Sequence, residues 1–261
     1  MDREPSPEPS ADETAQAALG QRRDANAPLA LLAQLAAALR FLTVLPLRGV
    51  LAPLGEGALF FPLVGLALGG VLALLDRAAA PLAPGARAVL LVATLAALSG
   101  GRQLRGLARG VQALVRGGDV QRPGAAGAVA VCVLLLVKIA TIGALRTSTR
   151  TMALLYAPML ARWSMVVLAF GSRTAGPGDG SELVRTVKFR EFGVATVSAL
   201  WVALANGAAR GLLAILVLAV ITICCRIFVH ARLGGVTDDL LGAIVEVNET
   251  LVLATFTLGT R

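Results

Sequence analysis

Near its C-terminus the chain reads Leu233-Gly-Gly-Val-Thr-Asp-Asp-Leu-Leu-Gly-Ala-Ile-Val-Glu-Val-Asn-Glu249 and continues into an apolar run over residues 250–259. Apolar residues over this length predict a membrane-spanning helix. At about 100° per residue, the four acids of the stretch fall within an arc of roughly 100°. Carboxylates inside a bilayer are costly and normally face a polar cavity, a cation or a substrate. The pattern therefore predicts a functional site on one helix face, formed by Asp238, Asp239, Glu246 and Glu249.

A structural role is the alternative for the first two acids of this stretch. Asp238 and Asp239 stand where a helix would begin, and carboxylates there can cap the helix and favour its positive end. Glu246 and Glu249 lie past the first turn, so capping does not account for them. For Glu246 and Glu249, a role in a functional site is therefore the stronger interpretation.

Composition indicates a polytopic membrane protein. The chain has 261 residues, of which 56% are hydrophobic and 15% charged, and a mean hydropathy of +0.76. Its net charge of +8 suits anionic headgroups or phosphorylated ligands. No basic patch interleaved with aromatic residues is present, so nucleic acid is not an expected partner. The three cysteines have neither disulfide-framework nor metal-ligand spacing.

Hydrophobic segments predict an all-α bundle of about seven transmembrane helices in a single membrane-embedded domain, residues 28–261. The polar tail, residues 1–27, is predicted to be disordered. Residues 28–47 suit a re-entrant or interfacial helix as well as a span. Gly65, Gly69 and Gly70 form a small-residue face to which another helix could pack closely. The other expected spans are 58–75, 86–101, 125–145, 152–170, two within 194–225, and 240–259.

Lysine and arginine counts predict the orientation of the helices. Residues 102–125 hold five arginines, 171–193 hold three arginines and one lysine, and 226–239 hold two arginines. The intervening loops are poorer in basic residues. The three richer loops are therefore predicted to be cytoplasmic, and the acidic site with them.

Five motifs follow one another in order: Arg40-Phe-Leu-Thr-Val-Leu-Pro46, Phe60-Phe-Pro-Leu-Val-Gly65, Ser99-Gly-Gly-Arg-Gln-Leu-Arg-Gly-Leu-Ala108, Arg162-Trp163 and Gly234-Gly-Val-Thr-Asp-Asp-Leu-Leu-Gly-Ala-Ile-Val-Glu246. Together they resemble the cobalamin synthase family, the adenosylcobinamide-GDP ribazoletransferases of bacteria and archaea. The resemblance covers the chain from about residue 35 to its end.

The resemblance implies a multi-pass enzyme of the bacterial inner membrane with its site facing the cytoplasm. Such enzymes join adenosylcobinamide-GDP to α-ribazole or its 5′-phosphate, release GMP, and use Mg²⁺. Displacement of a nucleotide from a pyrophosphate needs a cation to neutralise charge on the phosphoryl oxygens, and a few carboxylates suffice to hold Mg²⁺. Asp238, Asp239, Glu246 and Glu249 are the candidate metal ligands, with Asp238, Asp239 and Glu246 as catalytic candidates and Asp119 as a further acid.

The chain departs from the family at its hallmark motif, approximately Thr-Gly-Gly-x-His-Leu-Asp-Gly-Leu-Ala-Asp-x-x-Asp. Gln103 stands at the histidine position, and Arg105, Arg109 and Gln112 stand at the aspartate positions. Every metal-capable side chain of the motif is replaced. On a helix, Arg102, Arg105, Arg109 and Arg116 lie within about 60° of one another, and a guanidinium fork suits phosphate oxygens. Arg102, Arg105 and Arg109 are therefore candidate phosphate-binding residues.

Several interpretations remain open. The chain is an active transferase whose arginines contact phosphate, or an inactive relative that binds corrinoid or partner subunits from cobalamin assembly. The arginine row alternatively lies on anionic headgroups. A transporter or other membrane binding protein is also possible, because Lys138, Arg162, Glu246 and Glu249 could line a pathway. Lys138 suggests a buried ion pair or a snorkelling side chain, and Arg162 a structural or ligand-facing residue.

Overall fold

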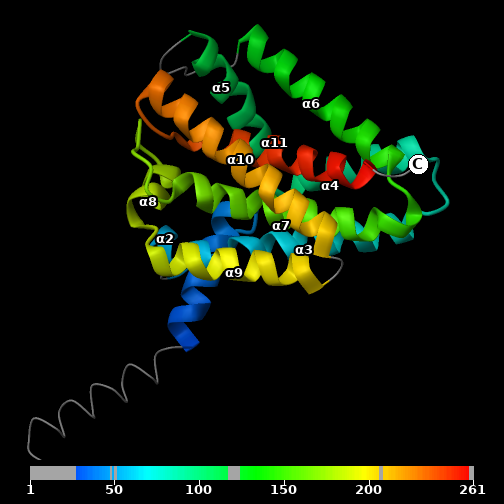
Figure 1. The fold of residues 1–261 in the computed structure, drawn as a ribbon, viewed down its shortest axis with the longest axis horizontal. Coiled ribbons are helices and arrows are strands. Elements are labelled where there is room, and N and C mark those ends of the chain that lie inside the picture. The colour runs from blue at the N-terminus through cyan, green and yellow to red at the C-terminus, as the bar shows by residue number, and fades with distance from the viewer. Residues whose placement is uncertain (1–27, 48, 50–51, 117–123, 206–207, 259–261) are drawn as a thin grey trace, which may run out of the picture.

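Helices make up the architecture of this chain in a computed structural model that describes residues 28–47, 49, 52–116, 124–205 and 208–258 (Figure 1). These residues include no β-strand, and an isolated parallel bridge joins Thr174 to Val236. The predicted all-α fold is confirmed. The predicted disordered tail lies outside the described residues, and the domain boundary at residue 28 stays a prediction. An N-terminal helix, Pro28–Leu42, precedes α2 (Leu54–Gly57), η1 (Ala58–Phe60), α3 (Phe61–Ala78), α4 (Pro84–Leu98), α5 (Arg102–Arg116), α6 (Ala125–Ala144), α7 (Thr147–Ala169), α8 (Asp179–Thr186), α9 (Phe189–Ala205), α10 (Ala208–Leu233) and α11 (Asp238–Thr257).

Five helical segments among the described residues are long and apolar enough to cross a membrane, and a bent pair makes six. The prediction of about seven spans is roughly consistent with this number. The bent pair is α4 with α5, whose axes turn by 87°, so α5 runs across the direction of α4. The region 194–225, predicted to hold two spans, divides between α9 and α10, and α9 has only 17 residues. The five segments are Leu54–Ala78, Ala125–Ala144, Thr147–Ala169, Gly211–Leu233 and Asp238–Thr257.

Helix α7 lies at the centre of the bundle, where it packs against α3 and α11 (Figure 1). Most of its residues are buried, including Arg150 and Arg162. Helices α6 and α10 are mostly exposed and apolar, which suits a surface against lipid. The core of the protein is therefore built around α7.

Glycines allow α3 to approach α7 closely. A Cβ atom added at Gly65 would lie 2.4 Å from the carbonyl oxygen of Pro158, and one at Gly69 would lie 2.6 Å from that of Leu154. Neither position has room for a side chain. The predicted helix contact is thus confirmed for these two glycines, whereas a Cβ at Gly70 would have nothing within 4 Å.

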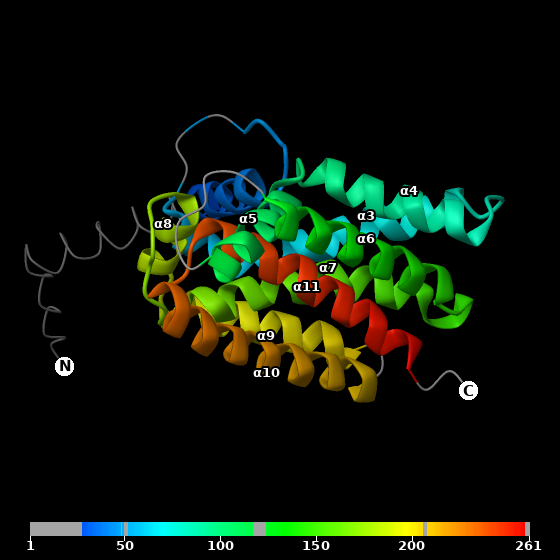
Figure 2. The same cartoon turned by 90° about the horizontal axis from the view of Figure 1, so that it is seen from above.

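The N-terminal helix, α5, α8 and the first turn of α11 gather at one end of the bundle, called here the α5 end (Figure 2). The three segments rich in lysine and arginine meet there. Arg232 Nε donates to the carbonyl of Leu114, and the amide of Arg173 donates to His230. The segments that the charge pattern placed on one side of the membrane therefore lie together.

A separate ionic cluster ties the opposite end of the bundle together. Asp76 Oδ1 on α3 lies 3.3 Å from Arg87 Nε on α4 and 3.6 Å from Arg150 Nη1 on α7. Arg150 also donates to the carbonyl of Ile142 at the end of α6, at 2.7 Å. Four helices are thereby joined at that end, far from the pocket described next.

Candidate functional site

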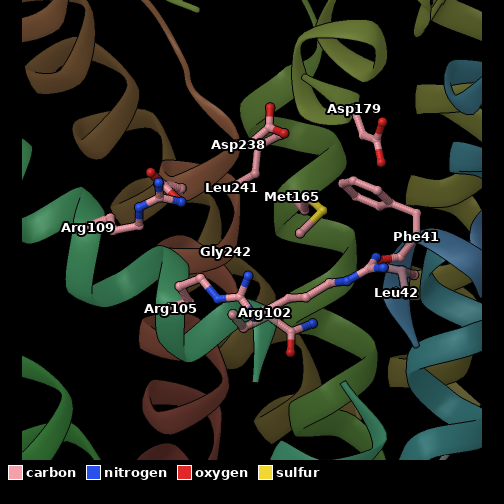
Figure 3. Close-up of a pocket in the computed structure, with 12 residues that line it drawn as sticks. Phe41, Leu42, Arg102, Arg105, Arg109, Met165, Asp179, Asp238, Leu241 and Gly242 are labelled. Carbon is pink, nitrogen blue, oxygen red and sulfur yellow. The ribbon is translucent and has the colours of Figure 1, made fainter. Parts of the chain in front are cut away.

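A pocket of about 240 Å³ opens at the α5 end, between α5 and the first turns of α11 and α8 (Figure 3). Its polar wall combines basic and acidic side chains, and its apolar wall comes from the N-terminal helix, α7 and α11. The lining residues are Phe41, Leu42, Arg102, Gln103, Arg105, Arg109, Met165, Asp179, Asp238, Asp239, Leu241 and Gly242.

Close packing of α5 on α11 forms the floor of this pocket. A Cβ atom at Gly106 would lie 2.7 Å from the carbonyl oxygen of Asp239, and one at Gly242 would lie 3.2 Å from Cα of Gln103. Helix α5 buries its glycines and small residues against α11 and turns its arginines outward, because its apolar and basic residues follow the helical period. The motif that resembles the family hallmark therefore becomes one wall of the pocket.

The three arginines predicted to bind phosphate all line the pocket, but their surroundings differ. Arg102 Nη1 donates to the carbonyls of Arg40 and Phe41, at 3.2 and 3.0 Å, and so holds the C-terminal end of the N-terminal helix. Arg105 is exposed, and Arg109 Nη1 lies 3.6 Å from Asp239 Oδ1. Arg105 and Arg109 are thus the pair best placed to meet a ligand, whereas Arg102 is engaged in a structural contact.

Asp238 supports α8. Its Oδ1 accepts a hydrogen bond from the amide of Ser181 at 3.2 Å, and the amides of Asp179 and Gly180 also interact with its carboxylate. Orphan amides in the first turn of a helix are commonly satisfied in this way. In Figure 3 the Asp238 carboxylate points away from the arginines of α5. Asp238 therefore helps to position α8, and its role as a metal ligand stays a prediction.

Sequence reasoning missed Asp179, the first residue of α8. Its carboxylate points into the pocket from the side opposite α5 (Figure 3). An acid after Gly178 at the start of a short helix is an ordinary capping pattern, and nothing in its spacing relates it to residue 239. Only the contact between α8 and α11 brings it to the site.

Glu246 and Glu249 lie deeper in the bundle, in a buried quartet with Lys138 of α6 and Arg162 of α7. Lys138 Nζ lies 2.5 Å from Glu246 Oε2 and 3.0 Å from Glu249 Oε1. Arg162 Nη1 lies 2.5 Å from Glu249 Oε2. All four side chains are at least 94% buried, and two cations balance two anions. The buried ion pair predicted as one option for Lys138 is confirmed, and Arg162 joins it.

The four acids of α11 therefore do not lie in one place: Asp238 and Asp239 line the pocket, whereas Glu246 and Glu249 lie in the quartet. Their roles as metal ligands and catalytic residues stay predictions. Asp239 and Glu246 share a helix face, but seven residues separate them by roughly 10 Å along the axis. Lysine and arginine from neighbouring helices neutralise the deeper pair. No group of three or more His, Cys, Asp or Glu side chains that could hold a metal ion occurs among the residues with described positions. Asp119, the further predicted acid, lies outside them.

Similarity to known proteins shows the family of this chain. The family model described as Cobalamin-5-phosphate synthase matches residues 34–257, which include nearly all of the described bundle. The chain belongs to this family. The four residues that replace the histidine and aspartates of the motif in the sequence comparison above fall in and beside the pocket: Gln103, Arg105 and Arg109 line it, and Gln112 is buried on α5 outside the lining.

Curated relatives span nearly the same length. The chain is 37% identical over 242 residues to "Adenosylcobinamide-GDP ribazoletransferase" of Pseudomonas paraeruginosa, an alignment that covers 87% of this chain and 98% of the relative. It is 36% identical over 236 residues to the protein of the same name from Geotalea daltonii, covering 84% and 94%. The protein of that name from Roseiflexus sp. is 33% identical over 239 residues, covering 85% and 88%. No solved structure matches the chain.

Proposed function

We propose that this cobalamin-5-phosphate synthase family member joins adenosylcobinamide-GDP to α-ribazole or its 5′-phosphate, with the pyrophosphate held in the pocket between α5 and α11. One observation carries the proposal. The segment that matches the family hallmark forms the pocket wall and presents Arg105 and Arg109 to it. The proposed substrates follow from the name that the relatives share, adenosylcobinamide-GDP ribazoletransferase.

The proposed reaction is a substitution at phosphorus. A hydroxyl oxygen of ribazole forms a bond to the phosphorus that carries cobinamide, the bond from that phosphorus to the bridging oxygen breaks, and GMP leaves with that oxygen. The hydroxyl proton is released. Negative charge is spread over the phosphoryl oxygens throughout, so fixed positive groups accelerate the step by electrostatic stabilisation and in-line positioning. Arg105 and Arg109 are placed to supply that charge.

Mg²⁺, the metal that the family resemblance implies, does not fit the described residues of this pocket. Two of the positions that should bear aspartates bear Arg105 and Arg109, which would repel a divalent cation. Asp238 accepts amides of α8, and Asp239 is paired with Arg109. No step of the proposed reaction is therefore assigned to the metal.

The charge distribution supports a location in the bacterial inner membrane with the pocket open to the cytoplasm. The α5 end contains the segments rich in lysine and arginine, which bacterial membrane proteins keep on the cytoplasmic side. Exposed apolar faces on α6 and α10 suit lipid contact. A nucleotide-linked substrate in the cytoplasm would then reach the pocket directly.

Binding without transfer is the second candidate function. The replacement of metal-capable side chains by Arg105, Arg109 and Gln112 favours it, since charge reversal at a metal site removes the metal's contribution to catalysis. An inactive relative would hold the corrinoid nucleotide or partner subunits of cobalamin assembly. The transporter alternative gains no such support, because its four charged groups neutralise one another beside a cavity of only about 10 Å³.

Growth complementation separates the two candidates. The chain is expressed in a bacterial strain that lacks its own cobalamin synthase, and cobinamide-dependent growth is scored with the Pseudomonas paraeruginosa relative as positive control. Transfer predicts rescue by the parent chain and by Arg116→Ala, an exposed arginine of α5 outside the pocket, but not by Arg105→Ala with Arg109→Ala. Absence of rescue despite normal membrane expression would contradict transfer and leave binding as the function.

A further inference from the structure

We infer that the pocket binds a pyrophosphate-bearing nucleotide without a divalent metal, and that Asp239 is the counterion which the phosphate displaces from Arg109. The inference deepens the proposed function and rests on it only in taking this pocket as the phosphate site. As a counterion, Asp239 competes with the phosphate for Arg109, whereas as a metal ligand it would help to bind the phosphate. Removal of its charge should therefore raise the affinity for phosphate in the first case and lower it in the second.

The pocket presents its positive charge on a rigid surface. Arg105 and Arg109 are four residues apart on α5, so their side chains leave the helix on the same face. The glycine contacts with α11 hold this helix in place. Two planar guanidinium groups on one face can each offer two parallel N–H donors to phosphate oxygens.

The contact between Arg109 and Asp239 is replaceable. Nη1 and Oδ1 are 3.6 Å apart, and the two side chains are 33% and 30% exposed. Exposed pairs with this separation contribute little to stability, because water competes for both groups. The pyrophosphate group as a whole carries two negative charges and offers more acceptor oxygens than one carboxylate does, so an incoming pyrophosphate should take the place of Asp239 at Arg109.

The other acids of the pocket are not arranged to hold a metal with Asp239. The Asp238 carboxylate accepts amides of α8 and points away from α5 (Figure 3). Asp179 faces the cavity from the opposite side. The described residues supply no group of three metal-capable side chains here. Direct contact with arginine is the remaining way to neutralise a bound phosphate.

Cavity size limits what the pocket itself encloses. Its volume, about 240 Å³, lies below the roughly 300 to 1,000 Å³ typical of sites that enclose a whole drug-sized ligand. A pyrophosphate group suits this space, whereas the corrin and the guanosine of the proposed substrate would extend beyond it. The ligand class is therefore defined by its phosphates, and inorganic pyrophosphate and GDP are suitable probes.

The test measures binding of inorganic pyrophosphate and of GDP to the purified full chain in detergent or nanodiscs. Binding is measured with excess EDTA and again with Mg²⁺. We expect binding in EDTA, with an affinity that Mg²⁺ raises by no more than about twofold. Arg105→Ala and Arg109→Ala should each weaken binding by about 10- to 100-fold, and Arg116→Ala should leave it unchanged.

Asp239→Asn gives the deciding result, because the amide keeps the shape of the side chain and removes its charge. Freed from its counterion, Arg109 should bind pyrophosphate about two- to fivefold more tightly. Asp179→Asn also removes one negative charge from the pocket but leaves the contact between Arg109 and Asp239 in place, so its increase in pyrophosphate affinity should be smaller. The melting temperature and gel-filtration profile of each variant verify that it is folded.

Three results would overturn the inference: binding that requires Mg²⁺, weaker binding by folded Asp239→Asn, or no binding of either probe by the folded parent chain. Failure of the proposed transfer is a separate result. A chain that binds pyrophosphate in EDTA yet does not rescue growth retains the metal-free site and lacks the reaction.

Discussion

Helix α11 places acids in two regions that behave in opposite ways. At its first turn, Asp239 faces an open pocket. Its Oδ1 lies 3.6 Å from Arg109 Nη1, and both side chains are partly exposed. In its middle, Glu249 is enclosed by Lys138 and Arg162 at 3.0 and 2.5 Å, with each side chain at least 98% buried. Depth along the helix therefore decides the role of each carboxylate. Charges in the open pocket can exchange partners, whereas charges in the quartet hold the bundle together.

The physical reason for the difference is solvation. Removal of a charge from water costs several kcal/mol, and only close partners in the interior compensate for that cost. If one partner is lost there, the others stay buried without compensation. In the pocket, water replaces a lost partner at little cost. Substitutions on the same helix should thus have very different effects on stability.

Glu249→Gln should have the largest effect. It leaves Lys138 and Arg162 buried with one carboxylate between them, and loss of one partner from a buried ionic group typically costs about 3–5 kcal/mol. A large fall in the thermal unfolding midpoint in detergent, with low membrane yield, is expected. Adding Arg162→Met to this variant restores neutrality, so the double variant should be more stable than the single one. Equal stability of the single variant and the parent would show that the quartet does not support the bundle.

Gly106→Ala should have the next largest effect, through the floor of the pocket. Its new Cβ would lie 2.7 Å from the carbonyl oxygen of Asp239, so α5 and α11 must separate. Overpacking of this kind costs about 1–3 kcal/mol, and pyrophosphate binding should fall together with stability. Gly70→Ala is the matched control, because its Cβ would have nothing within 4 Å. If Gly106→Ala binds and melts like that control, the close helix contact is not needed for the pocket.

Much of this architecture was predictable from hydrophobic patterning. The periodicity and length of apolar segments gave the membrane helices, and Gly65 and Gly69 marked a close helix contact that the structure contains. Arg102, Arg105 and Arg109 of α5 were expected on one helix face, and all three line the pocket. Such patterns describe a single helix and its faces, so they hold before any neighbour is known.

What could not be predicted depends on which helices meet. Helical angles grouped Glu246 with Asp239 on one face of α11, but they could not show that Lys138 and Arg162 of other helices neutralise the deeper acids. Asp179 reaches the pocket because α8 packs on α11. The 87° turn between α4 and α5 was not predicted either, although it falls at Gly100 and Gly101, whose φ values of 62° and 65° suit glycine. Periodicity contains no information on partners across the bundle.

Asp238→Ala tests the structural acid of the pocket. Loss of the acceptor for the first-turn amides of α8 resembles removal of a helix cap, which costs about 0.5–2 kcal/mol. We expect faster amide hydrogen exchange within α8 than in the parent, with little change in α7. Asp238→Asn keeps an acceptor oxygen and should show a smaller increase. Unchanged exchange in α8 for the alanine variant would contradict the supporting role.

Asp239→Asn should have the smallest effect on stability, and it completes the comparison with Glu249→Gln. An exposed pair contributes about 0–1 kcal/mol, and salt screens it further, since the Debye length is about 8 Å at 0.15 M. The unfolding midpoint should therefore stay close to that of the parent, and the small difference should shrink as salt is added. Both substitutions convert an acid of α11 to its amide, so they differ mainly in depth. Destabilisation of Asp239→Asn comparable with that of Glu249→Gln would mean that Asp239 is a structural partner of Arg109, and a phosphate could then not displace it without loosening α5 from α11.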